Sequence, residues 1–413
     1  MSHTHVIGGG LAGLSAALAL TEAGRAVTLY EASPACGGRC RSYFDQTLGC
    51  RIDNGNHLLL SGNHTAMAYL ERLGTRQTLG GPASPVFPFM DLARGTRWVL
   101  RPSLGRIPIW LLRKARRVPG TSPLDYLALL RLGQARPTDT VANNLPDNAL
   151  FRRFVAPLCI AALNTHPIKG SARLLGAVID ETLARGGAAC IPLFPRHGLS
   201  ESFIDPAVAR LRDAGATVRT GAAITALPRD AGRVTSLIGS QGPIPLGPTD
   251  SVVLAVPPWS AAEMLPELTV PDEYQAILNL HFRIDADPGE AGFWGLVNAT
   301  AEWVFVKPGV VSVTISAANR LVDRRAEDLA ATVWPEVRRL LNLPPTLPPW
   351  RVVKEKRATF AATPAQNTRR PAAETPWQNL ALAGDWTATG LPATIEGAIR
   401  SGLTAARVLG VAA

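Results

Sequence analysis

The sequence predicts an α/β fold in which a domain of parallel strands and helices is interleaved with a second, α+β domain. Near the N-terminus, residues 4–30 read as strand, glycine-rich turn, helix and strand, and a strand followed by a helix recurs at 379–409. The 413 residues are too many for one small core and too few for three independent domains. We therefore expect two domains that share the chain between them.

The first unit has the spacing of a nucleotide-binding turn. A β-prone run at 4–7 is followed by glycines at 8–13, apolar residues at helical spacing over 14–23 and a second β-prone run at 26–30. In a G-x-G-x-x-G turn the first glycine makes the turn, the second lets the backbone approach a pyrophosphate, and the third lets helix and strand pack closely. The helix N-terminus adds free N–H groups and a partial positive charge. We expect a Rossmann-like domain that binds a dinucleotide through Gly8, Gly10, Leu11, Ala12 and Gly13.

An acid ends the second strand of this unit. Glu31 stands at the distance from the glycines where a carboxylate accepts hydrogen bonds from ribose hydroxyls, and an acid here favours an unphosphorylated ribose over that of NADP. We expect Glu31 and Ala32 to lie beside the ribose. The strand–turn–helix unit by itself leaves FAD and NAD open.

Two further segments favour FAD. Gly37-Gly38-Arg39 extends the first motif, and Arg39 offers a planar cation to a pyrophosphate or a flavin edge. Residues 52–57 form a polar turn before the apolar Leu58-Leu59-Leu60. This extension resembles that of flavin amine oxidases and carotenoid desaturases, whose fold is glutathione-reductase-like, and NAD-binding Rossmann domains do not usually carry it. The resemblance implies an FAD-binding domain with flavin contacts at Gly38, Arg39, Gly55, Asn56 and His57.

The C-terminal unit suits the same cofactor. An apolar strand ends at Gly384-Asp385, and a helix is predicted from 395 to 409 with Thr394 as its N-cap. A helix N-terminus aimed at the N1/C2=O edge of a flavin stabilises the charge that gathers there on reduction. Another strand and helix of the sheet is the alternative reading. The residues expected to contact FAD here are Gly384, Asp385, Ala393, Thr394 and Ile395.

Strands at 214–227 and 250–258 are read as the return of the chain to the FAD-binding domain, with Ile224 near the adenine and Ala255 at the cofactor. The chain is therefore divided between two domains. We assign 1–78, 196–258 and 355–413 to the FAD-binding domain, and 79–195 and 259–354 to the substrate-binding domain.

The charge balance points to a membrane surface or to ordinary solvation. The formal net charge is +10, and no run of about 18 apolar residues exists that would span a bilayer. Segment 103–118 combines Trp110 and several Leu and Ile residues with five cations, as an interfacial segment does. A surface segment that covers the core is the alternative, since Pro108 interrupts any long helix. Basic residues are otherwise scattered, so nucleic acid is not expected as a partner.

Several kinds of chemistry find no support. The histidines lack metal-ligand spacing and the five cysteines do not form a zinc pattern, so no metal is expected. No nucleophile motif of a hydrolase is present. The first residues do not read as a signal peptide, which predicts a cytoplasmic protein, associated at most with the inner face of the cytoplasmic membrane.

Several strings together resemble one family over the whole chain. They are GGGLAGLSAA at 8–17, GGR at 37–39, DNG at 53–55, AALNT at 161–165, KEKRATF at 354–360 and AGDWTATGLPATIEGA at 383–398. They are similar to the bacterial hydroxysqualene dehydroxylases, also called squalene-associated FAD-dependent desaturases. The last two strings are the most particular, and Asn56 departs from the Gln expected there.

The resemblance implies that reduced FAD replaces the hydroxyl of hydroxysqualene with hydrogen to give squalene for hopanoid or triterpene synthesis. A long apolar isoprenoid substrate, an external electron donor and peripheral membrane contact follow from it. No cysteine lies in the closing motif, so FAD is expected to be bound non-covalently. Candidates for the catalytic groups are Asp53, His57 and Arg357.

Two other functions remain open at this point. A carotenoid-type desaturase or an amine oxidase would use the flavin in the oxidising direction. A non-catalytic flavin or lipid carrier assembled with a prenyl synthase would bind FAD without turnover.

Overall fold

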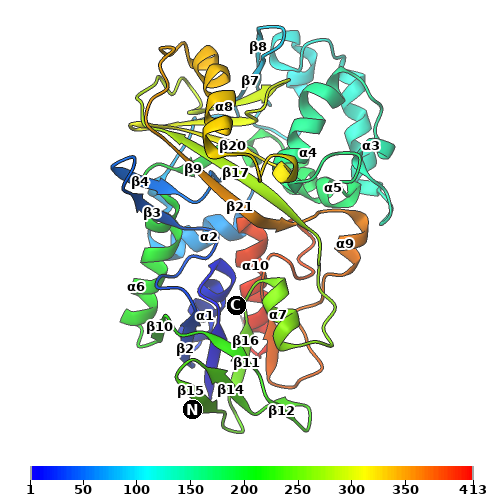
Figure 1. Cartoon of the computed structure of the whole chain (residues 1–413). Coiled ribbons are helices and arrows are strands. Elements are labelled where there is room, and N and C mark those ends of the chain that lie inside the picture. Colours follow the sequence, from blue (N-terminus) through cyan, green and yellow to red (C-terminus); the bar gives the residue numbers. More distant parts are fainter. Residues whose placement is uncertain (1, 412–413) are drawn as a thin grey trace.

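The computed structural model describes residues 2–411, and its lower half in Figure 1 is the Rossmann-like domain. Five strands form a wholly parallel sheet in the order β10-β2-β1-β16-β22. All five strands lie in segments that the sequence predicts as strands. The strands are β1 His3–Ile7, β2 Ala26–Glu31, β10 Thr217–Thr220, β16 Ser251–Leu254 and β22 Leu380–Leu382.

Alternate residues of the central strands face two different layers. Val253 of β16 joins a core formed by helices, whereas Val252 and Leu254 join the core on the opposite face. The first face is covered by α1 Leu11–Glu22, α2 His64–Leu73, α6 Asp205–Asp213 and α10 Ile395–Val408. The second face is covered by the three-stranded sheet β11 Ile224–Ala226, β14 Ser236–Gly239 and β15 Gly242–Pro245, and by α7 Pro258–Met264.

The first and last helices pack directly against each other (Figure 1, dark blue and red). The Oγ of Ser15 in α1 donates to the carbonyl of Ile399 in α10 at 3.0 Å. A Cβ at Gly402 would lie 2.2 Å from the carbonyl oxygen of Ala12, so only glycine permits this approach. The two predicted nucleotide motifs, nearly 400 residues apart in sequence, are therefore neighbours in space.

The second domain is built on a seven-stranded sheet in the order β21-β17-β20-β19-β18-β7-β8. Every neighbouring pair is antiparallel except β18 and β7. Helix α8, Ala326–Leu341, covers one face through an apolar core of its own. The strands are β7 Phe87–Asp91, β8 Thr96–Leu100, β17 Tyr274–Phe282, β18 Phe293–Val297, β19 Trp303–Lys307, β20 Val310–Ile315 and β21 Trp350–Phe360.

A segment of short helices between residues 109 and 189 packs on the β7–β8 side of this sheet (Figure 1, upper right). It contains the 3₁₀ helices η2 Ile109–Leu112, η3 Lys114–Arg116 and η4 Pro123–Gln134, and the α-helices α3 Val141–Asn144, α4 Ala156–Leu163 and α5 Ala172–Glu181. The remaining elements include the hairpins β3 Ser42–Asp45 with β4 Cys50–Asp53 and β12 Arg229–Asp230 with β13 Arg233–Val234, helix α9 Pro364–Thr368, and a small sheet of β5 Leu59–Leu60, β6 Leu79–Gly80 and β9 Pro192–Pro195.

Two of the domain boundaries drawn from the sequence fall inside structural elements. Strand β21 continues through the boundary at 354/355 and pairs with β17 as far as Phe360, so residues 355–360 are part of the seven-stranded sheet. The boundary at 258/259 falls in α7, which packs on the parallel sheet through Ala261. No glycine or proline stands at 354/355, so the sequence offers no break in β21. Pro257 and Pro258 do mark a break, but it lies at the start of α7 and not after it.

Among the described residues no helix is long and apolar enough to cross a membrane. Nor do three or more His, Cys, Asp or Glu side chains between residues 2 and 411 gather in a way that could hold a metal ion.

Candidate flavin site

The glycines of the first motif are required for different structural reasons. Gly8 has φ +109°, and a Cβ there would lie 2.5 Å from the carbonyl oxygen of Ala255. A Cβ at Gly13 would lie 1.9 Å from the carbonyl oxygen of Gly8. Both positions therefore need glycine for the packing of the protein itself. A Cβ at Gly10, in contrast, meets nothing within 4 Å.

The open space at Gly10 lies at the start of α1. Gly10 is the N-cap of this helix, no side chain caps it, and its first turn holds no acid. The N–H groups at Leu11 and Ala12 are thus free to bind an anion, which is what a pyrophosphate requires. Gly38, with φ +56°, also lies here, because its Cβ position is 3.6 Å from the Cα of Gly10. These residues fit the pyrophosphate of FAD.

Glu31 shapes the turn in addition to its predicted role at the ribose. Its Oε2 accepts from the N–H of Gly9 at 2.7 Å and its Oε1 from the N–H of Ser33 at 2.8 Å. A carboxylate oxygen accepts more than one hydrogen bond, so ribose hydroxyls remain compatible with both contacts. The N–H of Ala222 donates to the carbonyl of Glu31 at 2.9 Å, and the strand that begins with buried Ile224 therefore starts close to Glu31 and Ala32.

Arg39 joins the two halves of the site. Its guanidinium donates to both carboxylate oxygens of Asp385, at 2.7 and 2.8 Å, and to the carbonyl of Ala358. Asp385 follows Gly384, whose N–H donates to the Oγ of Ser401. The pairing brings the Gly-Gly-Arg turn of the N-terminus against the Gly-Asp turn of the C-terminus, as a single cofactor bound by both motifs requires.

Arg370 also contacts Asp385, and no motif in the sequence identifies it. Its Nη2 donates to the carbonyl of Asp385 at 3.1 Å and to Thr389 at 2.8 Å, while its Nε is buried without a partner in residues 2–411. Burial lowers the pKa of Arg370 to about 10, which leaves it charged at neutral pH. An unpaired buried donor beside the Gly-Asp turn suits an acceptor on the cofactor.

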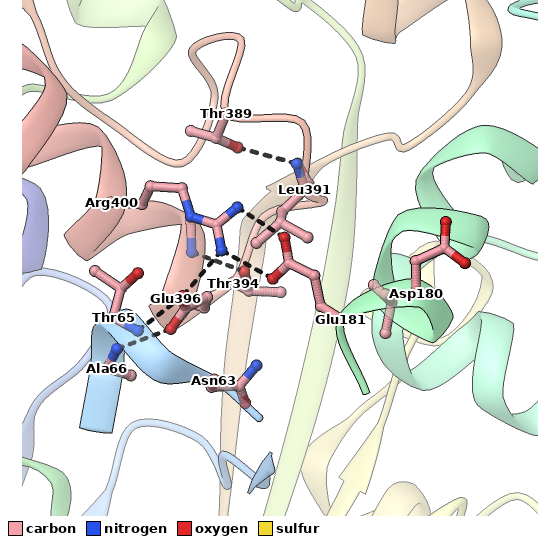
Figure 2. Close-up of polar contacts among 12 residues, drawn as sticks. Asn63, Thr65, Ala66, Asp180, Glu181, Thr389, Leu391, Thr394, Glu396 and Arg400 are labelled. Carbon is pink, nitrogen blue, oxygen red and sulfur yellow. Dashed lines mark hydrogen bonds and ion pairs between the residues drawn. The ribbon is translucent and has the colours of Figure 1, made fainter. Parts of the chain in front are cut away.

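The predicted N-cap of the C-terminal helix is confirmed, since the Oγ1 of Thr394 accepts from the N–H of Gly397 at 3.0 Å. Glu396 in the first turn does not point to the cofactor. Figure 2 shows its carboxylate between Arg400 and the start of α2, where it accepts from the N–H groups of Thr65 and Ala66 at 3.0 and 2.8 Å. Arg400 in turn holds Glu181 of α5 with two hydrogen bonds of 2.9 and 2.8 Å.

This network fixes the start of α10 in place. Asn63 makes no side-chain cap at α2, so the buried carboxylate of Glu396 supplies the missing acceptor from a different helix. Because Arg400 reaches α5, the same network ties α10 to the segment of short helices. Ala393, Thr394 and Ile395 are thereby held at a defined distance from the second domain.

The polar turn at 53–57 lies against strands β17 and β20. The Nδ2 of Asn56 donates to the Oγ1 of Thr314 at 3.1 Å, and Thr314 donates to the Oδ1 of Asn279 at 2.8 Å. Asn279 in turn donates to the carbonyl of Asn54, and its amide lies 3.0 Å from a Cβ position at Gly55. The Oδ1 of Asn56 is buried and has no partner among the residues described.

Asp53 is held in a buried ion pair and is not suited to donate a proton. Its carboxylate accepts from Lys307 of β19 at 2.5 Å, from the Oγ of Ser42 at 2.6 Å and from the N–H of Leu199 at 2.8 Å. Burial alone would raise the pKa of Asp53, but Lys307 and the hydrogen bonds outweigh it, and the pKa lies below its ordinary value. At neutral pH Asp53 is therefore ionised and has no proton to donate, although the sequence makes it a catalytic candidate.

The two other predicted catalytic residues differ in their surroundings. His57 lies near Asp53, and burial lowers its pKa to about 4, so its imidazole is neutral at pH 7. Arg357 is exposed on β21, with its guanidinium 4.9 Å from the ring centre of Trp259 and 5.6 Å from that of Tyr274. The described contacts bring Asp53 and His57 together and place Arg357 on a pair of aromatic rings instead.

Glu302 is a further candidate for the proton donor, and no sequence pattern identifies it. It directly precedes β19, its N–H donates to the carbonyl of Thr314 at 3.3 Å, and its Oε2 accepts from the N–H of Ser316 at 2.7 Å. Burial raises the pKa of Glu302 to about 7, so a large share of these carboxyls carries a proton near neutral pH. The backbone of Glu302 is thus paired with that of Thr314, whose side chain binds Asn56.

A cluster of aromatic rings lies on the sheet beside Thr314. Trp303 pairs with Thr314 across neighbouring strands, so the two side chains share one face of the sheet. The ring of Trp303 lies 6.0 Å from that of Phe293 and 5.7 Å from that of Phe89, which stacks on Trp98 at 5.5 Å. The rings of Phe89, Trp98 and Phe293 are buried by these contacts, so an aromatic cluster covers the face of the sheet away from α8.

Comparison with known proteins agrees with this geometry. The family model described as flavin containing amine oxidoreductase matches residues 11–284 and 293–409. Hydroxysqualene dehydroxylases of Rhodopseudomonas palustris and Sinorhizobium fredii are 50% and 47% identical to this chain, over 98% of its length and 98% and 97% of theirs. That of Zymomonas mobilis is 46% identical, with 98% of each chain covered.

Solved structures show the same fold at much lower identity. An oxidoreductase from Methanosarcina mazei has a TM-score of 0.72 and 17% identity, with 97% of this chain and 99% of that chain covered. A redesigned putrescine oxidase has a TM-score of 0.70 and 14% identity, with 99% of both chains covered. The chain therefore belongs to the flavin-containing amine oxidoreductase family and, through its identity over nearly its whole length, to the hydroxysqualene dehydroxylases within it.

Proposed function

We propose that this chain removes the hydroxyl group of hydroxysqualene to give squalene, using FAD as its reductant. The observation that carries the proposal is identity of 46–50% to three hydroxysqualene dehydroxylases over nearly the full length of each. An aromatic cluster lies on the same sheet face as Thr314, the partner of Asn56, and such apolar surroundings suit a hydrocarbon substrate. The same relatives disfavour a carotenoid-type desaturase, an amine oxidase and a non-catalytic carrier.

FAD is held by residues from both ends of the chain. The N–H groups at the start of α1 and the guanidiniums of Arg39 and Arg370 bind the pyrophosphate region, Glu31 the ribose, and the turns at 384–385 and 393–395 the flavin half. No cysteine lies at 384–398, so the attachment is non-covalent. When bound and reduced, FAD supplies the hydride that takes the place of the hydroxyl.

Glu302 supplies the proton in this proposal. Hydroxide is a poor leaving group, so the hydroxyl takes the carboxyl proton of Glu302 and the C–O bond breaks to release water. The carbon then carries an allylic positive charge until the hydride reaches it. An electron-rich ring that is only partly buried, such as that of Trp303, stabilises a nearby cation by attraction to its face. Hydroxysqualene, one proton and one hydride thus give squalene and water.

The experiment is a single turnover without oxygen. Purified protein is reduced by light or dithionite and mixed with hydroxysqualene in detergent, the lipids are extracted for mass spectrometry, and the flavin absorbance is followed. We expect squalene to appear in step with flavin reoxidation. An intact yellow flavin and no squalene would contradict the proposal. Turnover of a carotenoid precursor or an amine by the oxidised protein would then support a desaturase or an oxidase.

A further inference from the structure

The helix η4 exposes a regular stripe of leucines. A 3₁₀ helix has three residues per turn, so residues three apart in sequence lie on one line along it. One such line, Tyr126, Leu129 and Leu132, is buried. The next line is Leu124, Leu127 and Leu130, and these side chains are 57–73% exposed. A helix on an ordinary protein surface would carry polar residues there.

The neighbouring helix η2 repeats this arrangement. Ile109 and Leu112, again three residues apart, are 61% and 76% exposed, while Trp110 between them is buried. The buried rings of Trp110 and Tyr126 meet edge to face at 5.4 Å, and the N–H of Val118 donates to the hydroxyl of Tyr126. This contact joins η2 and η4 into one unit, and the exposed lines of both helices lie on its outside.

We call this outside the apolar surface, and it extends along the chain to two more exposed side chains. It consists of Leu104, Ile107, Ile109, Leu112, Leu124, Leu127 and Leu130. So many large apolar side chains in two adjacent short segments exceed the single exposed residues that are normal for a soluble protein. A binding partner for this region is the physical explanation.

Cations surround the apolar surface. Arg106, Arg113, Lys114 and Arg131 are exposed in the same two segments. In the part of the chain that the structure describes, none of them forms an ion pair with a carboxylate. Apolar side chains at the centre with unpaired cations beside them match acyl chains beneath anionic phosphates.

The apolar surface is also joined to the interior. Trp110 and Tyr126 belong to the same core as Trp98 and Phe89. Phe89 in turn contacts Trp303, which shares a sheet face with the residues at the flavin loop. The buried sides of η2 and η4 thus belong to one packed core that reaches the sheet face beside the flavin loop.

We propose that the apolar surface and its cations dock this protein on an anionic phospholipid bilayer, so that an isoprenoid passes from the lipid to the flavin site without entering water. The bilayer part of the proposal stands whatever the substrate is. The passage of an isoprenoid rests on the proposed function. In Figure 1 the segment that carries the apolar surface is cyan to blue-green and lies at the upper right, away from the hairpin β3–β4.

The test is sedimentation of the FAD-bound full chain with vesicles. Vesicles of phosphatidylcholine with about one third phosphatidylglycerol are compared with phosphatidylcholine alone. We expect binding to the anionic vesicles that weakens when NaCl is raised from about 0.05 M to about 0.5 M. The double variant Ile109→Glu, Leu127→Glu should bind the anionic vesicles at least about tenfold more weakly than the wild type, because two anchoring side chains become anionic.

A matched control separates this from a general effect of surface charge. Phe44→Glu, Ile168→Glu also replaces two well-exposed apolar side chains, but outside the apolar surface, and should bind as the wild type does. Flavin absorbance and thermal unfolding confirm that each variant is folded. The proposal is overturned if the wild type stays in the supernatant, or if both double variants lose binding equally.

Vesicle binding and turnover are measured separately. If the bilayer also delivers the substrate, the Ile109→Glu, Leu127→Glu variant loses turnover on vesicle-borne hydroxysqualene and keeps it in detergent. Bilayer binding without squalene formation in either medium would contradict the proposed function alone.

Discussion

The buried ion pair between Lys307 and Asp53 allows a quantitative test of how the second domain holds the polar turn beside the flavin. The side chains of Lys307 and Asp53 are 13% and 4% exposed, and the ammonium lies 2.5 Å from the carboxylate. In the variant Lys307→Met the carboxylate keeps only Ser42 and the N–H of Leu199 as donors. Removal of one partner of a buried pair costs about 3–5 kcal/mol, and we expect a loss of this size at pH 7.

The pH dependence of the loss identifies its cause. In the wild type the pKa of Asp53 is lowered from 3.8, so the pair stabilises the fold above that pH and the contribution disappears as the pH falls through the folded pKa. In Lys307→Met burial dominates and raises the pKa of Asp53 above 3.8. The buried carboxyl then costs least at low pH and more as the pH rises. The difference between variant and wild type should therefore grow between about pH 4 and about pH 7.

The free energy of unfolding is measured by urea unfolding, followed by tryptophan fluorescence. The FAD concentration is kept fixed, because bound ligand also stabilises the folded state. Lys356→Met is the control. Lys356 pairs with Asp323 at 3.0 Å, but these side chains are 68% and 83% exposed, and loss of such a pair costs about 0–1 kcal/mol. Adding Asp53→Asn to Lys307→Met should recover part of the stability. A cost for Lys307→Met no larger than the control, or one that does not change with pH, would refute the reasoning.

Three further substitutions test the site. Gly10→Ala should keep the stability of the wild type, because the added Cβ meets no protein atom. In a flavin fluorescence titration it should bind FAD at least about tenfold more weakly, which corresponds to about 1.4 kcal/mol. Gly105→Ala, whose Cβ also lies in open space, is the control and should not change FAD binding. Glu396→Gln should lower the free energy of unfolding by about 1–2 kcal/mol because α2 loses a charged cap, and an unchanged melting temperature would contradict this. Glu302→Gln should slow dehydroxylation by about 10²–10⁴-fold. We expect the wild-type rate to fall as the pH rises through about 7, and this fall should be absent in the variant. A variant with the same pH profile as the wild type would exclude Glu302 as the donor.

The sequence predicted the cofactor half of the structure well because its signals are local. A glycine turn between a strand and a helix, or a threonine before a helix, is recognisable within a few residues. The predicted helix at 395–409 is α10, at 395–408, with Thr394 as its cap. The Arg39–Asp385 pair is long-range, yet both partners were predicted to bind the same cofactor, which makes their contact expected.

The second domain was harder because its polar groups meet across distant strands. Asn279 and His281 alternate with leucines in β17, and Ser312 and Thr314 alternate with valines in β20, a period of two that indicates a polar face. The pattern does not say which residues that face contacts. Lys307 and Asp53 are separated by 254 positions, and only the sheet register brings them together.

The apolar surface was only half predicted, for a related reason. Segment 103–118 was recognised from its mixture of tryptophan, leucine and cations, and the structure shows that it also covers the core, through Trp110 and Val118. The leucine stripe of η4 was missed. Its spacing of three matches neither an α-helix nor a strand, so a search for those two periods finds no face there.

The contact between α1 and α10 has a consequence for how the protein is made. The N-terminal helix emerges from the ribosome first, but its partner helix and strand β22 are the last elements of the described chain. At about 5–20 residues per second, synthesis of the intervening chain takes roughly 20–80 s, during which the apolar side of α1 that α10 later covers stays unpaired. FAD therefore cannot be loaded on a nascent chain in its final form. Loss of even the last turns of α10 should yield a protein that is colourless and prone to aggregate.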